Sequence, residues 1–139
     1  MRTFLIVLAG AIIGVMLARL ASGQDAYAFA SPQHPALSRL AQQHAEYQAR
    51  VCVQGHQGFS QQFHAAQQAV GLSQVSEICA ECWPWQHNAT WTEQWAEYTK
   101  CWRQSPGHWS VARQRHRLIG VGSARGANGV WYGVLIAAD

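Results

Sequence analysis

The sequence has few charged residues: they make up 12% of 139, with 10 Lys and Arg against 7 Asp and Glu. A surface dedicated to nucleic acid needs clustered basic residues, so we expect no nucleic-acid partner. Internal repeats and low-complexity tracts are also missing, which argues against a repeat architecture. No serine lies in a G-x-S-x-G pattern, so the usual signature of a hydrolase nucleophile is missing. A chain of this length is expected to form one domain.

Apolar residues, by contrast, make up 49% of the sequence, and seven residues are Trp. This composition predicts a packed core rather than disorder. In the helix expected over 90–103, aromatic residues recur at three- and four-residue steps, at Trp91, Trp95, Tyr98 and Trp102. Such a stripe is more typical of a helix buried under a sheet than of a carbohydrate platform.

The N-terminal segment has the features of an export signal. Arg2 precedes an apolar run over 4–17, and Ala26-Tyr27-Ala28 matches an A-x-A cleavage site. The run is short for a membrane span, so residues 1–28 are expected to be a cleaved signal peptide or a retained N-terminal anchor. In both cases the linker over 29–34 and the domain over 35–139 are exported. We therefore expect a secreted or periplasmic protein that contacts a membrane only through a retained N-terminal segment.

Four cysteines are present, Cys52, Cys79, Cys82 and Cys101. An even number in a small exported protein predicts disulfides, for which three connectivities exist. The Cys79-x-x-Cys82 spacing also occurs in redox proteins and zinc clips. Redox motifs of this kind sit in βαβ units, however, and the neighbouring pattern is not βαβ. Structural disulfides are the favoured interpretation.

Periodicity and turn residues predict the secondary structure. Helices are expected over 35–51, 59–70 and 90–103, an extended or ambiguous segment over 75–82, and strands at Leu118–Ser123 and Val130–Ala137. Asn128-Gly129 is the preferred two-residue turn for a hairpin between these two strands. Ile119 and Val121 are expected on one face of the sheet. Asn88 or Thr90 can cap the third helix, and Ser105-Pro106-Gly107 ends it.

Five motifs in order resemble a bacterial member of the CAP superfamily, also known as the cysteine-rich secretory protein or SCP-like domain. They are LAQQHAEYQARV, GHQGF, SEICA, CWRQSPGHWSVA and LIGVGSARGANGVWYGVLIA, which together run from about Pro35 to the C-terminus. The Ser-Pro-Gly-His segment followed by Ile-Gly-Val-Gly is the most specific pair. The resemblance implies an α+β fold: an α/β/α sandwich with a small, mostly antiparallel sheet between helical layers.

The resemblance also implies a cleft formed by His56, Glu77 and His108. Two imidazoles and a carboxylate can bind a divalent metal, zinc or less favourably calcium, or can act as an acid–base site. The alternative is that they make ordinary hydrogen bonds in a cleft. Ile78 departs from the family pattern, which has Asn there, and Ser105 stands where eukaryotic members carry a second glutamate.

These observations predict an extracytoplasmic binding or interaction domain with a His-Glu-His cleft. The expected ligand is a peptide, a glycan or a lipid. Two alternatives stay open: a hydrolase acting on peptides or cell-envelope polymers, and a lipid- or sterol-binding module. The sequence assigns no catalytic residue.

The same cleft suggests a pairing of the cysteines. If 77–82 is extended, Cys79 shares a face with Glu77 and therefore points towards the histidines and Cys52, whereas Cys82 points to the opposite face. We expect Cys52–Cys79 and Cys82–Cys101. The alternative, Cys79–Cys82 with Cys52–Cys101, is favoured if the segment is a turn or a helix.

Overall fold

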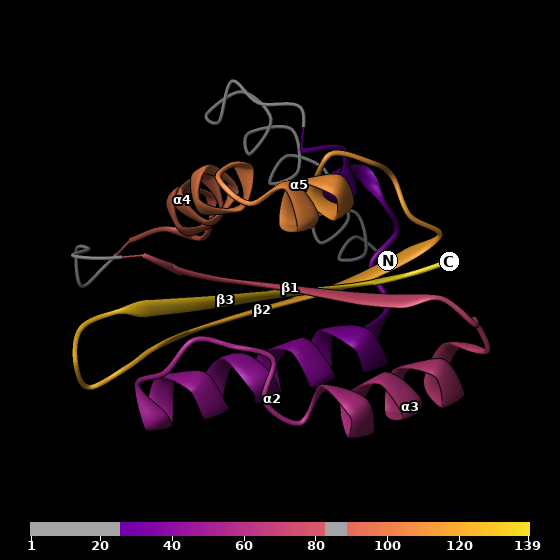
Figure 1. Cartoon of the computed structure of the whole chain (residues 1–139), viewed down its shortest axis with the longest axis horizontal. Helices are drawn as coiled ribbons and strands as arrows, with labels where there is room; N and C mark the ends of the chain where they lie inside the picture. Colours follow the sequence, from indigo (N-terminus) through magenta and orange to yellow (C-terminus); the bar gives the residue numbers. More distant parts are fainter. Residues whose placement is uncertain (1–25, 83–88) are drawn as a thin grey trace, which may run out of the picture.

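The computed structural model describes residues 26–82 and 89–139, and these form an α/β/α sandwich (Figure 1). The elements in chain order are η1 (Tyr27–Ala30), α2 (Pro35–Val51), α3 (Phe59–Val70), β1 (Val75–Cys82), α4 (Trp91–Arg103), α5 (Pro106–Ala112), β2 (Leu118–Arg125) and β3 (Trp131–Ala138). Helices α2 and α3 cover one face of the sheet, and α4 and α5 cover the other (Figure 1). The predicted α+β class and layered arrangement are confirmed. Within the described ranges, no helix is both long enough and apolar enough to span a membrane.

The sheet has the strand order β1-β3-β2, and both strand pairs are antiparallel. β1 is therefore an edge strand, and its side chains alternate between the two helical layers. Cys79 packs in the cluster formed with α2 and α3, whereas Ile78, Ala80 and Cys82 pack in the cluster formed with α4. The extended interpretation of residues 75–82 is correct, and it places Glu77 on the α2 side.

The strands β2 and β3 form the predicted antiparallel hairpin, and Ile119 and Val121 share one core cluster as expected. The turn between them differs from the prediction. Gly126 N–H donates to the carbonyl of Val130 and Gly129 N–H to the carbonyl of Gly126, which leaves a three-residue loop. Gly129 has φ +83°, so it supplies the left-handed residue of a turn with a bulge instead of the second position of a two-residue turn.

Helix α2 lies unusually close to β2 because two glycines of that strand face it. A Cβ on Gly120 would lie 2.1 Å from the carbonyl carbon of Leu37, and one on Gly122 would lie 2.3 Å from the backbone N of Gln42. The Ile-Gly-Val-Gly strand therefore lets the helix backbone rest directly on the sheet. This contact fixes the distance between α2 and the sheet, and hence the position of the polar residues on the buried face of α2.

The opposite layer is built on aromatic residues. Trp95, Tyr98 and Trp102 are buried as the stripe predicted, whereas Trp91 is 51% exposed. Thr90 caps α4: its hydroxyl accepts from Glu93 N–H, and the Glu93 carboxylate accepts from Thr90 N–H. Sequence reasoning missed α5, because Pro106 was interpreted only as a stop. Pro106 ends one helix and begins the next, where its missing N–H has no cost.

The segment before α2 also packs on this layer. Phe29 lies against Trp95 and Trp102, with ring centroids 5.4 and 6.2 Å apart, and Ala28 is fully buried. The predicted signal peptide or anchor falls largely on residues 1–25, outside the described residues, and cleavage after Ala28 stays a prediction.

The predicted disulfides are not formed in this structure, where all four cysteines are free. Cys79 and Cys82 face opposite sides of β1, so the alternative Cys79–Cys82 bridge lacks the turn or helix it requires. Burial raises the pKa of both thiols well above the usual range, and for Cys79 the Glu77 carboxylate adds to the effect. Both thiols are therefore protonated at neutral pH.

Candidate functional site

Glu77 is the centre of a polar cluster at the edge strand β1. Only 7% of the residue is exposed, and each carboxylate oxygen contacts a different imidazole. Oε2 lies 2.9 Å from Nδ1 of His44, and Oε1 lies 3.0 Å from Nδ1 of His56. Because a carboxylate only accepts hydrogen bonds, both imidazoles donate from Nδ1, and in their neutral forms each keeps a lone pair on Nε2.

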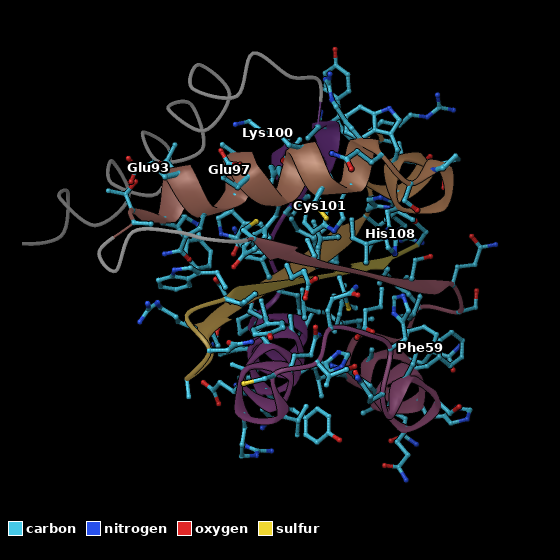
Figure 2. The ribbon with its side chains drawn as sticks, turned by 60° about the vertical axis from the view of Figure 1, so that its left-hand side comes forward. Phe59, Glu93, Glu97, Lys100, Cys101 and His108 are labelled. Atoms are coloured by element: carbon cyan, nitrogen blue, oxygen red, sulfur yellow. The ribbon has the colours of Figure 1, made fainter. Side chains whose placement is uncertain are left out.

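His108 approaches the same cluster from the opposite helical layer. Its ring centroid lies 5.8 Å from that of His56, although His56 precedes α3 and His108 belongs to α5. Figure 2 shows His108 above β1 and Phe59, at the start of α3, below it. The two layers can meet here because β1 has no further strand of the described chain beside it to keep them apart.

Exposure divides the cluster into an outer and an inner part. The His56 side chain is 45% exposed and that of His44 only 4%. Partial burial lowers the pKa of His108, and the neighbouring His56 lowers it further. His108 is therefore neutral at physiological pH, the form in which imidazole binds metals.

Cys79 extends the inner part. Its Sγ lies 3.6 Å from Oε1 of Glu77 and 3.8 Å from Nδ1 of His56, and it accepts from Nε2 of Gln48 at 3.5 Å. One ligand atom from each of His44, Glu77 and Cys79 lies within 4.8 Å of the others, so this group can hold a metal ion. Metal binding there would first require removal of the proton from a deeply buried thiol.

A groove of about 310 Å³ lies between α2 and α3 on the other side of His44. His44 forms part of its wall together with Tyr47, Gln57 and Gln61. The Nε2 atom of His44 and the Oε1 atom of Gln57 are buried and have no hydrogen-bond partner among the described residues.

The structure thus brings His56, Glu77 and His108 to one edge of the sheet. Sequence reasoning missed His44 as a residue of this site. The available signal was its place in the apolar stripe of α2, in register with Leu37 and Ala41. A histidine at a buried helix position needs a polar partner, and Glu77 is that partner.

Comparisons with known proteins support the fold alone. No protein-family model matches the chain, and no curated protein matches its sequence. Among solved structures it is similar to an outer surface protein from Borrelia burgdorferi, at a TM-score of 0.59 and 12% identity. The likeness covers 95% of this chain and 90% of that one.

Proposed function

We propose that this protein is an extracytoplasmic, CAP-like binding domain in which His56 and His108 bind a divalent metal, with Glu77 holding His56 in place. One observation carries the proposal. The buried Glu77 carboxylate accepts a hydrogen bond from Nδ1 of His56 at 3.0 Å, while the centroid of the His108 ring lies 5.8 Å from that of the His56 ring. Metal-binding histidines commonly donate their second ring N–H to a carboxylate in this way.

This assignment gives Glu77 a different role from that of a direct ligand. Both of its oxygens are already occupied by imidazoles. The carboxylate fixes the tautomer and the orientation of His56, so Nε2 is the nitrogen offered to a metal. Two imidazole ligands favour zinc over calcium, because calcium takes oxygen ligands. Two protein ligands leave coordination positions for water and for an oxygen of the bound ligand.

Two further findings support the extracytoplasmic, CAP-like assignment. The residues that the resemblance singles out come from three distant segments and lie together at the edge of one sheet. The structural neighbour is an outer surface protein, which agrees with export directed by the N-terminal apolar run.

Zinc titration of the metal-free protein by calorimetry tests the proposal. We expect His56→Ala and His108→Ala each to weaken zinc binding at least about tenfold, and Glu77→Gln to weaken it about 10- to 100-fold. His64→Ala, an exposed histidine on α3, is the matched control and should change nothing.

Cys79→Ser separates this site from the buried one. It removes a ligand of the His44–Glu77–Cys79 group, whereas its contact with His56 is to Nδ1 at 3.8 Å and not to the Nε2 offered to the metal, so zinc affinity should persist. Loss of binding in Cys79→Ser together with full binding in His108→Ala would overturn the proposal and assign the metal to the buried group.

A further inference from the structure

The groove between α2 and α3 has an unusual wall. Its polar lining consists of four glutamines, one tyrosine and one histidine: Gln43, Gln57, Gln61, Gln62, Tyr47 and His44. No Lys, Arg, Asp or Glu of the described residues contributes to it. A ligand that fits this lining is neutral, because a charge would find no opposite charge.

Two atoms of the wall lack hydrogen-bond partners, and both are acceptors. Nδ1 of His44 donates a hydrogen bond to Glu77, so the unpartnered Nε2 lies on the far side of the ring. The His44 side chain is only 4% exposed. Gln57 donates from Nε2 to the carbonyl of Val53 at 3.5 Å, and its Oε1 is left buried without a partner within the described part of the chain. A buried acceptor without a donor is unfavourable, and a ligand that donates a hydrogen bond to it would remove this cost.

We propose that this groove binds a neutral carbohydrate, with His44 Nε2 and Gln57 Oε1 each accepting a hydrogen bond from a sugar hydroxyl. Hydroxyl groups donate to these acceptors and also accept from glutamine amides. The Tyr47 ring, over which the Arg50 guanidinium lies at 5.5 Å, forms another part of the lining. The volume of about 310 Å³ is at the lower end for ligand sites and suits one or two sugar rings. The apolar part of the lining comes from Leu40, Ala65 and the ring of Tyr47.

Glu77 links the groove to the edge of the sheet. One of its oxygens sets the tautomer of His44 and the other sets that of His56. The carbohydrate proposal nevertheless stands without a metal, because it uses neither His56 nor His108 as a contact. Its test is therefore done on metal-free protein in EDTA, where failure of zinc binding has no effect on the result.

The test is an NMR titration of the full protein with cellobiose and with N,N′-diacetylchitobiose, up to about 20 mM so that a millimolar Kd is within reach. We expect shifts in backbone and side-chain amide signals of α2 and α3. The Nε2 signal of His44 should move without protonation of the ring, which is the signature of a new hydrogen bond to a neutral imidazole.

Two variants and one control locate the site. Gln57→Leu removes one acceptor at similar size, and Gln61→Ala removes an exposed amide of the wall. Each should weaken binding, Gln57→Leu by about tenfold, equivalent to one hydrogen bond of about 1.4 kcal/mol. Gln68→Ala, an exposed glutamine of α3 that does not line the groove, should leave binding unchanged.

Three results would overturn the proposal. The first is that neither disaccharide shifts the His44 signal. The second is that Gln68→Ala weakens binding as much as Gln57→Leu. The third is that tetra-alanine produces the shifts and the sugars do not. The last outcome would assign the groove to peptides.

Discussion

A single methyl group added at Gly122 should separate α2 from the sheet. The Cβ of an alanine there would lie 2.3 Å from the backbone N of Gln42, 2.4 Å from its Cα and 2.5 Å from the carbonyl carbon of Ala41, where ordinary contact begins at 3.4 Å. These are backbone atoms of a helix, which cannot rotate away as a side chain can. Helix α2 must therefore move outwards by about 1 Å, the difference between these distances and ordinary contact.

The cost follows from what α2 buries. Leu37, Ala41 and Ala45 are fully buried against the sheet, and a gap of up to about 1 Å forfeits a quarter to a half of each dispersion contact. Overpacking a core costs about 1–3 kcal/mol, and we expect about 3 kcal/mol here because the clash is with backbone. For a domain of this size that corresponds to a fall in Tm of roughly 12 °C or more.

Urea unfolding and thermal melts followed by circular dichroism measure this effect. Gly107→Ala is the matched control: Gly107 lies in α5, a Cβ there meets nothing within 4 Å, and alanine is the better helix former by about 1 kcal/mol. The control should be neutral or slightly stabilising. If the free energy of unfolding of Gly122→Ala lies within about 0.5 kcal/mol of the wild-type value, α2 does not pack against β2 as tightly as described.

Two further predictions concern the ends of elements. Cys52 ends α2 at φ +56°, a conformation that costs a non-glycine residue about 1–2 kcal/mol, so Cys52→Gly should raise the free energy of unfolding by about 1 kcal/mol. A loss of about 2–5 kcal/mol under oxidising conditions would show instead that Cys52 is disulfide-bonded. Partial burial raises the pKa of Asp139, but hydrogen bonds from His116 and from Arg117 N–H outweigh it, so the pKa lies below its ordinary value of 3.8. The pKa of Asp139 is lower in the folded than in the unfolded state, so this stabilisation is complete above pH 3.8 and is lost as the pH falls through the folded value. In urea unfolding, Asp139→Asn should therefore make the free energy of unfolding fall less steeply with decreasing pH below pH 3.8. An unchanged pH dependence would contradict this prediction.

Local chemistry was enough to predict most elements of the fold. Helix α2 begins at Pro35, which suits a first helical turn, and α3 ends at Gly71, whose φ of +67° is accessible to glycine at little cost. The capping box of Thr90 and Glu93 likewise acts within one helical turn. Such signals act over a few residues, so they can be recognised without knowledge of the tertiary structure.

The hairpin shows a feature that local sequence signals could not predict, the length of its loop. The sequence predicted an antiparallel pair of strands over Leu118–Ser123 and Val130–Ala137 around Asn128-Gly129, and the observed strands, Leu118–Arg125 and Trp131–Ala138, pair in that way. It did not determine the loop length, because the same dipeptide fits a two-residue turn and a three-residue turn with a bulge. The register of the flanking strands, fixed by packing on both faces, decided between them.

The candidate site depended on tertiary structure to a greater degree. A family resemblance indicated His56, Glu77 and His108, but the partnership of His44 with Glu77 joins residues 33 positions apart and carries no local signature. Its cause is the strand order: β1 lies at the edge of the sheet, and α2 is held against the same sheet by glycines of β2. Only that arrangement brings a helix histidine and a strand carboxylate into a buried hydrogen bond, which leaves Nε2 of His44 without a partner among the described residues.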